Sequence, residues 1–157
     1  MGNSFSLLSS RRALDREAEV TGDAGRLLAA DRIILPGVGA FGDARAKLDA
    51  TGLVPVIQEE AEKKPLLGIC LGMQLLLERS FEYGEHPGLG LIPGEVRPIR
   101  DVIPAGLAVP HLRWDDPRLP AERPRSPSFA ALEEGEHVLL APSHAGFASG
   151  GGITARP

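Results

Sequence analysis

The sequence predicts an α/β protein with an open, mostly parallel sheet flanked by helices. Two short apolar runs, 32–35 and 65–69, have the composition of buried strands. Segments of helical composition follow them, at 41–50 and 53–64 after the first run and at 71–78 after the second. Strands that alternate with helices form parallel sheets, because a parallel connection must cross back over the sheet.

Four further segments complete the expected order of elements. The leucine-bearing run 4–18 predicts a helix, and 136–141 has the composition of one more strand. The segment 91–99 predicts an edge strand, because its prolines cannot donate to a central ladder. Residues 115–127 include four prolines and three arginines, which indicates an exposed loop.

Length and composition favour a single domain, residues 1–157, and exclude several classes of partner. A chain of 157 residues is long enough for one hydrophobic core. Its formal net charge of -4 does not attract nucleic acid or an anionic membrane surface. No apolar run approaches the roughly 20 residues that span a bilayer, and the N-terminus lacks a secretory signal pattern. Since the one cysteine cannot form an internal disulfide, we expect a soluble protein of the reducing cytoplasm.

Cys70 stands in a pattern that predicts a catalytic nucleophile. Gly68 and Gly72 lie two residues before and two after it, at a predicted junction of strand and helix. A nucleophile elbow needs small residues at these places, because the backbone approaches its neighbours closely there. The helix that begins at Leu71 directs backbone N–H groups at the sulfur, which favours the thiolate and provides donors for an oxyanion. The alternative is a buried structural thiol, which lone cysteines often are.

The segment 37–42 (GVGAFG) matches the G-x-G-x-x-G pattern of dinucleotide-binding proteins. It follows a predicted strand and opens a predicted helix, as that pattern requires. That pattern also requires an acidic residue at the end of a second strand, about twenty positions further on. Glu59 and Glu60 stand at about that distance, but they lie within a predicted helix. We therefore interpret the loop as a set of backbone N–H donors beside the nucleophile, and we expect no cofactor and no metal.

Two long segments, 34–42 (ILPGVGAFG) and 65–74 (PLLGICLGMQ), carry a resemblance to a known family. The pair resembles the glutamine amidotransferase subunits of imidazole glycerol phosphate synthase, class I glutamine amidotransferases of histidine biosynthesis. Segments 88–94 (GLGLIPG) and 109–114 (VPHLRW) add to the resemblance in the expected order. The likeness runs over about residues 2–137.

The resemblance implies a reaction, a partner and a set of site residues. The family hydrolyses glutamine to glutamate and ammonia, and the ammonia passes to a cyclase subunit within a heterodimer. Cys70 would attack the side-chain amide of glutamine and form a glutamyl thioester. The resemblance also implies an oxyanion hole from the backbone of Val38 and Leu71, substrate contacts by Gly37, Gly39, Gln74 and Glu82, and cyclase contacts by His111 and Trp114.

Several of these residues have a plainer alternative interpretation. Gln74 and Glu82 also fit exposed surface side chains, and Trp114 also fits an ordinary core aromatic. Members of the family have glycine at the place of Arg113, so a large cation there would crowd the expected contact with the cyclase.

The sequence departs from the family pattern at both ends. The family begins with a strand for which this sequence, starting at MGN, has no counterpart, and its catalytic His and Glu lie in a His-Pro-Glu segment beyond the last residue here. We therefore expect an incomplete domain without the first strand and the C-terminal part, and a divergent, disordered tail over about 138–157. Without these proton-transfer partners, glutaminase activity should be impaired by the roughly 10²–10⁴-fold that general acid–base catalysis supplies.

The other histidines and the possible functions leave alternatives open. His86, His137 and His144 are expected to be surface side chains, with His144 as the alternative base.

The leading function is an impaired glutamine amidotransferase subunit. The second is a non-catalytic protein that docks on the cyclase or another partner. The third is a different cysteine hydrolase with the same elbow, although such proteins do not normally carry the 36–41 loop (PGVGAF).

Overall fold

The computed structural model describes residues 7–9, 17–104, 106, 109, 113–115, 137–140 and 143–148. Leu7–Ser9 are helical, in agreement with the helix predicted over 4–18, whereas Glu17 and Ala18 are not. The remainder of that prediction, and nearly all of the loop predicted over 115–127, lie outside the described residues.

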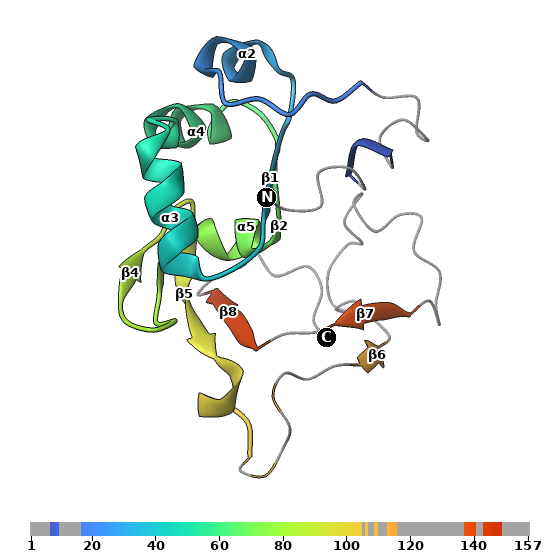
Figure 1. The fold of residues 1–157 in the computed structure, drawn as a ribbon, viewed down its shortest axis with the longest axis vertical. Coiled ribbons are helices and arrows are strands. Elements are labelled where there is room, and N and C mark those ends of the chain that lie inside the picture. The colour runs from blue at the N-terminus through green and yellow to red at the C-terminus, as the bar shows by residue number, and fades with distance from the viewer. Residues whose placement is uncertain are drawn as a thin grey trace.

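Two parallel strands form the centre of the described fold. β1 (Ile33–Gly37) and β2 (Leu66–Cys70) pair along their full length and end with Gly37 opposite Cys70 (Figure 1). Both strands lie where the sequence predicts them, and the expected α/β class with a parallel sheet is confirmed. Because paired residues of a parallel ladder lie side by side, the segments that follow Gly37 and Cys70 start next to each other.

Helices cover one side of this strand pair. In Figure 1, α3 (Phe41–Ala50), α4 (Val54–Ala61) and α5 (Leu71–Leu75) lie on the same side of β1 and β2. The positions of α3 and α4 agree with the prediction. α2 (Ala24–Ala29) has no counterpart among the predicted elements. Asp23 caps it by accepting the Arg26 N–H at 2.8 Å.

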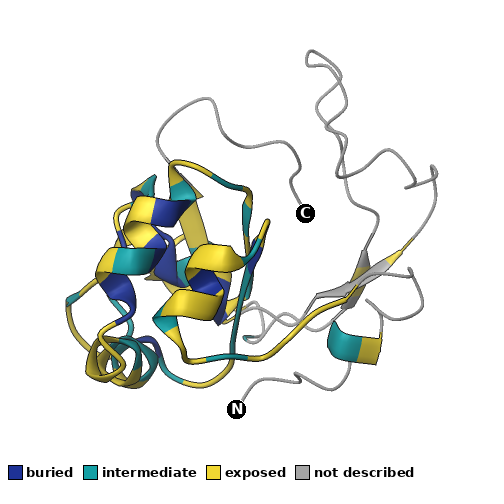
Figure 2. Ribbon diagram, turned by 90° about the horizontal axis from the view of Figure 1, so that it is seen from above, coloured by how far each residue is buried: buried dark blue, intermediate teal, exposed yellow. Residues whose placement is uncertain are grey.

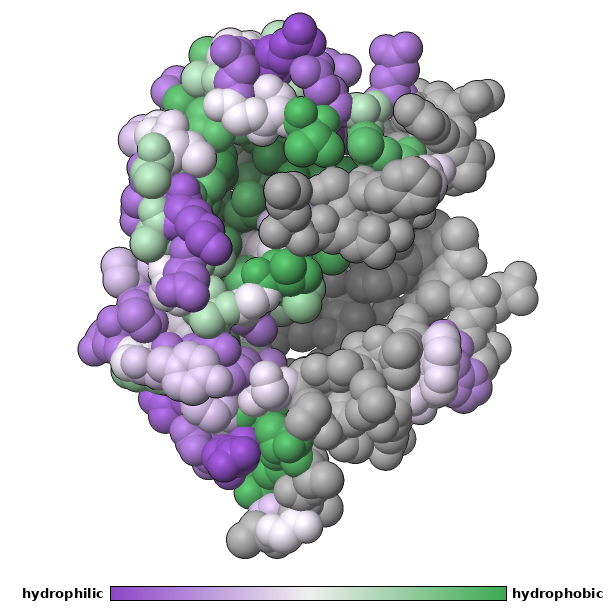
Figure 3. Space-filling view, in the orientation of Figure 1, coloured by the Kyte–Doolittle hydropathy of each residue, from purple (hydrophilic) through white to green (hydrophobic). Residues whose placement is uncertain are grey.

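The hydrophobic core lies between these helices and the strands. Phe41, the first residue of α3, is fully buried, and Ile57 of α4 is 2% exposed. Buried residues, dark blue in Figure 2, face inward from the helices. Figure 3 shows hydrophilic side chains on the outer side of α3 and α4, with apolar side chains gathered further in, toward the strands.

The two faces of β2 differ in cover. Leu66 packs against the core, whereas the next residue, Leu67, is 56% exposed. Successive side chains of a strand point to opposite faces, so the core of the described residues lies on one face of the sheet.

A second, mixed sheet follows α5. Its strands are β3 (Leu77–Ser80), β4 (His86–Pro87), β5 (Ile92–Pro98) and β8 (His144–Ala148), in the order β4-β3-β5-β8. β5 pairs in parallel with β3 and antiparallel with β8, so it is an inner strand and the edge-strand prediction for 91–99 is wrong. The reason is that Pro93 and Pro98 stand near its two ends, and the residues between them are free to pair on both sides.

The helix after Cys70 ends earlier than predicted. α5 stops at Leu75 and β3 begins at Leu77, whereas the sequence predicts a helix through residue 78. The 88–92 segment donates backbone N–H groups to the carbonyls of this stretch, among them Leu89 N–H to Leu75 at 2.7 Å and Gly88 N–H to Glu78 at 2.7 Å. Because these carbonyls accept from a distant segment, the helix does not continue.

The segment after residue 137 contains two strands. β7 (Val138–Leu140) pairs antiparallel with β6 (Arg113–Asp115), and β8 pairs with β5. The strand predicted over 136–141 is therefore confirmed in part. We expect disorder from about residue 138, whereas residues 144–148 form a strand that extends the second sheet. Residues 149–157 lie outside the described part.

An ion pair joins α4 to the end of α2. Glu60 is 4% exposed, and its Oε2 lies 2.6 Å from Lys64 Nζ. The same ammonium donates to the carbonyls of Leu28 at 2.9 Å and Ala30 at 2.7 Å. A cation at a helix C-terminus satisfies carbonyls that have no partner within the helix. Lys64 therefore fixes α2 against α4.

This ion pair should make stability sensitive to acid. Hydrogen bonds from Lys64 and Lys63 hold the pKa of Glu60 below its ordinary value of 4.5. The stabilisation is present above that ordinary value and is lost as the pH falls through the lowered one. We expect the Tm of the wild type to fall more steeply than that of Glu60→Gln between about pH 6 and about pH 3. The exposed control Glu62→Gln should keep the wild-type slope, and equal slopes for all three proteins would contradict the assignment.

Candidate functional site

Cys70 occupies a strained turn between β2 and α5. Its backbone has φ 56° and ψ -119°, in the left-handed region of φ that residues with a side chain rarely adopt. The thiol is free and exposed. A strained residue at a sharp strand-to-helix turn is the geometry of a nucleophile elbow, which the spacing around Cys70 predicts.

The two glycines of the elbow allow a close approach of backbones. A Cβ on Gly72 would lie 1.8 Å from the carbonyl oxygen of Leu35, and one on Gly68 would lie 2.5 Å from the Cα of Met73. Neither contact can be relieved by turning a side chain, because both involve backbone atoms. The glycines are therefore required where they stand, as the sequence analysis expects.

The loop after β1 lies beside the elbow. Gly37 pairs with Cys70, so Val38 and Leu71 are the first residues after the ends of two adjacent strands. A Cβ on Gly37 would lie 2.6 Å from the backbone nitrogen of Gly72, which shows how close the two segments come. Gly39 has φ 99°, a conformation that favours glycine. This arrangement brings Gly37, Val38, Gly39 and Leu71, all expected at the site, to one edge of the sheet.

Glu82 lies at the same edge. It follows β3, and its Oε2 accepts the backbone N–H of Phe41 at 2.6 Å. Phe41 opens α3, immediately after the loop that borders Cys70. The side chain of Glu82 is only 12% exposed, so the interpretation as an exposed surface residue is wrong. Gln74 lies on α5, one turn after Cys70, and is partly buried.

His144 reaches the site from β8. Its Nδ1 lies 3.5 Å from Oε1 of Glu82, although the two residues are 62 positions apart in the sequence. The His86 ring lies against α3, since a Cβ on Gly42 would be 2.7 Å from its Cε1. The expectation of surface side chains is confirmed for His137 and wrong for His86 and His144, which are partly buried. No sequence pattern could have paired His144 with Glu82.

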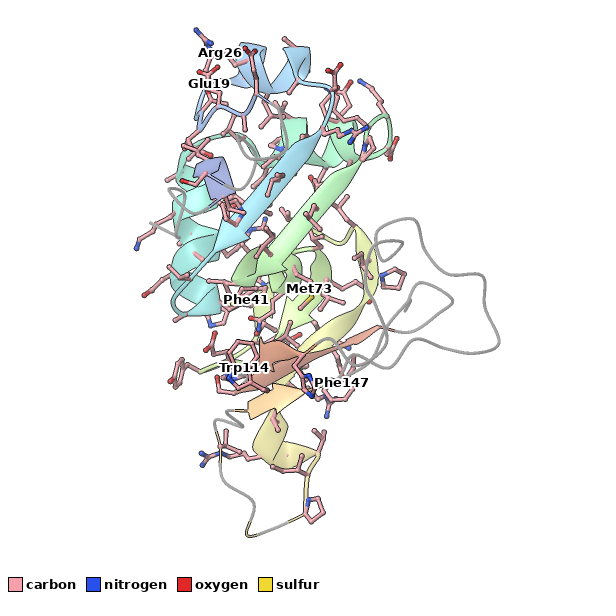
Figure 4. All side chains as sticks on the ribbon, turned by 90° about the vertical axis from the view of Figure 1, so that its right-hand side faces the viewer. Glu19, Arg26, Phe41, Met73, Trp114 and Phe147 are labelled. Atoms are coloured by element: carbon pink, nitrogen blue, oxygen red, sulfur yellow. The ribbon has the colours of Figure 1, made fainter. Side chains whose placement is uncertain are left out.

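The expected cyclase-contact residues are only partly described. His111 lies outside the described residues. Trp114 is 65% exposed on β6, so the alternative of a core aromatic is wrong. Phe147 of β8 is a second exposed aromatic side chain, with 41% of its surface exposed (Figure 4).

The GVGAFG loop does not have the surroundings of a dinucleotide site. Phe41, the fifth residue of the pattern, is fully buried and anchors the core. Glu60 is committed to its ion pair with Lys64, and Glu59 lies 2.5 Å from Lys63 Nζ. Glu59 and Glu60 are therefore held on α4 rather than at a strand end.

Within the described ranges, no three His, Cys, Asp or Glu side chains come together as ligands of a metal ion would. In the same part of the chain, no helix has the length and apolar character needed to cross a bilayer.

The fold and the cysteine elbow define a class I glutamine amidotransferase, and the chain belongs to that family. The family model for glutamine amidotransferase class-I matches residues 9–106, more than half of the chain. A solved structure described as a crystal structure of glutamine amidotransferase shares the fold with a TM-score of 0.72, and the match covers 99% of this chain and 76% of that one at 19% identity.

Among curated relatives, the similarity is to imidazole glycerol phosphate synthase subunit HisH. The protein of that name from Streptococcus sanguinis is 47% identical over 144 residues, which cover 91% of this chain and 67% of the relative. The one from Moorella thermoacetica is 53% identical over 124 residues, which cover 76% of this chain and 56% of the relative. The chain thus spans 56–67% of the length of these two proteins. The resemblance given by the sequence motifs is confirmed.

Replacing Gly72 with alanine should destabilise the fold. The added Cβ would meet the Leu35 carbonyl at 1.8 Å, so β1 or α5 must move. We expect a loss of about 3 kcal/mol in the free energy of unfolding, measured by urea denaturation. Gly22→Ala is the matched control, because nothing lies within 4 Å of its added Cβ, and it should change stability by less than about 0.5 kcal/mol. Equal effects of the two substitutions would contradict the close approach.

Cys70 should carry a cost in stability because of its backbone conformation. Glycine adopts a φ of 56° without strain, whereas alanine does not. Cys70→Gly should therefore be more stable than Cys70→Ala by about 1–2 kcal/mol in urea denaturation, despite the greater entropy of the unfolded glycine chain. A glycine variant that is less stable than the alanine variant would show that the turn is relaxed.

Proposed function

We propose that this chain is the glutamine-hydrolysing subunit of an imidazole glycerol phosphate synthase and supplies ammonia to a cyclase subunit. The observation that carries the proposal is the strained turn at Cys70, next to the loop that follows Gly37. The names of the curated relatives support the particular enzyme.

The chemistry would begin at the thiolate of Cys70. It attacks the carbon of the glutamine side-chain amide, and the negative charge that develops on the amide oxygen is held by backbone N–H groups of Val38 and Leu71. Collapse of this intermediate breaks the C–N bond, and the nitrogen takes a proton and leaves as ammonia. Water then cleaves the glutamyl thioester, which releases glutamate and restores the thiol.

Glutamine would be recognised by groups around the elbow. Glu82 presents a carboxylate at the edge of the sheet that holds Cys70, and it suits the α-ammonium group of an amino acid. Gln74 on α5, together with Gly37 and Gly39 in the loop, would complete the contacts. Because the Glu82 carboxylate is held by the Phe41 N–H, its position is set by the start of α3.

Among the described residues, the site shows no side chain placed to transfer protons to or from Cys70. In the described part of the chain, no histidine hydrogen-bonds to the Cys70 thiol. General acid–base catalysis typically contributes about 10²–10⁴-fold, so the chain should hydrolyse glutamine slowly. The same observation favours a second candidate function, a non-catalytic subunit that docks on the cyclase. Trp114, with 65% of its surface exposed, and His111 are proposed as contacts in either case.

A glutaminase assay separates the two functions. We expect the purified chain, with and without a cyclase subunit, to release glutamate about 10²–10⁴-fold more slowly than the Streptococcus sanguinis relative, because no histidine in the described part of the chain hydrogen-bonds to the Cys70 thiol. Any release should disappear in Cys70→Ala. Turnover comparable to that of the relative would contradict the expected impairment, and release that persists in Cys70→Ala would contradict the assigned nucleophile.

A further inference from the structure

Two partly buried, ionisable side chains, Glu82 and His144, lie against each other, and the chemistry described above assigns no role to His144. His144 Nδ1 lies 3.5 Å from Glu82 Oε1, and the two side chains are 15% and 12% exposed. They come from β8 and from the turn after β3. The contact thus joins the last described strand to the carboxylate that accepts the Phe41 N–H at the start of α3.

The two oxygens of Glu82 have different partners. Oε2 accepts the Phe41 N–H at 2.6 Å, and the backbone N–H of Glu82 donates to Ser80 Oγ at 3.2 Å. Since Ser80 is fully buried, the turn is anchored to the protein interior. Oε1 is the oxygen that remains for a cation, and it is the one that faces His144.

The protonation state of His144 determines what Oε1 meets. Nδ1 is also 3.1 Å from Ser143 Oγ, whose hydroxyl donates to Nδ1 when that nitrogen carries no proton. An imidazolium carries a proton on both nitrogens and can donate to Glu82 instead. The charge of the ring therefore sets which of the two contacts forms.

The charged and titratable groups near the pair come from several elements. β4 places His86 opposite Ser80, and its ring lies 6.5 Å from that of Phe41. β5 places Pro98 opposite His144, and the preceding Arg97 lies 2.5 Å from Glu95. α3 contributes the exposed Asp43 in its first turn, and α5 has no acidic residue in its first turn. Among the described residues, Glu82 is the acidic group within ion-pair distance of the His144 ring.

We propose that His144 is a positioning residue that controls, through its charge, access of the α-ammonium group of glutamine to Glu82. A neutral ring whose Nδ1 accepts from the Ser143 hydroxyl leaves Oε1 available to the substrate. The imidazolium occupies Oε1 and repels the ammonium group, so glutamine recognition weakens as the pH falls. This inference rests on the proposed function, since it requires that the elbow binds glutamine.

The single cysteine of the chain allows a direct test. The full chain is alkylated with iodoacetamide and, separately, with the chloromethyl ketone analogue of glutamine, which carries the α-ammonium and α-carboxylate groups. In the second reaction the sulfur forms a bond to the methylene carbon as chloride leaves. Both reagents react with the same thiolate, so the ratio of the two rates cancels the thiolate fraction and reports recognition of the amino acid.

The rate ratio should fall with pH in a way that depends on His144. We expect a decrease of about three- to tenfold between about pH 8 and about pH 6 in the wild type, the scale of interaction of partly screened charges. His144→Gln should show a nearly constant ratio. The control His137→Gln, which changes an exposed histidine, should behave like the wild type.

Two outcomes overturn the proposal in distinguishable ways. A preference for the glutamine analogue that does not change with pH in the wild type, or that changes equally in His144→Gln, overturns the role of His144 and leaves the proposed function intact. No preference for the analogue at either pH overturns the proposed function and this inference with it. His86→Gln, which changes the other partly buried histidine near the Glu82 turn, should keep the decrease seen in the wild type. Loss of the decrease in that variant overturns the role of His144 even if His144→Gln fails to fold.

Discussion

The backbone of α5 lies directly against the carbonyl of Leu35, and the geometry of the site depends on this approach. Gly72 leaves no room there for a side chain, and Gly68 leaves none beside the backbone of Met73. With both glycines in place, the turn between β2 and α5 is so short that Cys70 must adopt a φ of 56°. The strain at Cys70 is therefore a consequence of packing, and it is maintained by the buried Leu71 and Leu75 on the inner side of α5.

The same approach aligns the loop after β1 with the start of α5. Because Gly37 pairs with Cys70, two backbone segments leave adjacent strands together, and their N–H groups are the donors proposed to hold an oxyanion. The fully buried Phe41 then anchors the loop from its other end. Glu82 accepts the Phe41 N–H, which connects the second sheet to the start of α3. The close approach of α5 to Leu35 thus aligns the loop after β1 with the start of α5. The start of α3 and the turn with Glu82 follow from the same loop through Phe41.

Much of the first half of the chain could be predicted from the sequence, because local signals there agree with the fold. The strands at 33–37 and 66–70 are short apolar runs ended by glycine or by the elbow, and α3 has the predicted bounds. The predictions fail where distant backbone decides the outcome. The 71–78 segment has the composition of a helix, yet its carbonyls from Leu75 onward accept N–H groups from the 88–92 segment and the chain turns into β3. β5 is an inner strand because β8 pairs with it from about fifty residues further along the chain.

By itself the sequence determined the family to which the chain belongs, the glycines that the elbow requires and the position of the proposed nucleophile. These depend on residues within five positions of Cys70 and on one loop, so spacing along the chain is enough to reveal them. Only the tertiary structure decided that Glu82 is held by the start of α3, that Glu60 is taken up by Lys64, and that His144 faces Glu82. These contacts depend on which strands pair and on which side chains are buried together, and a single sequence carries no periodic signal for either.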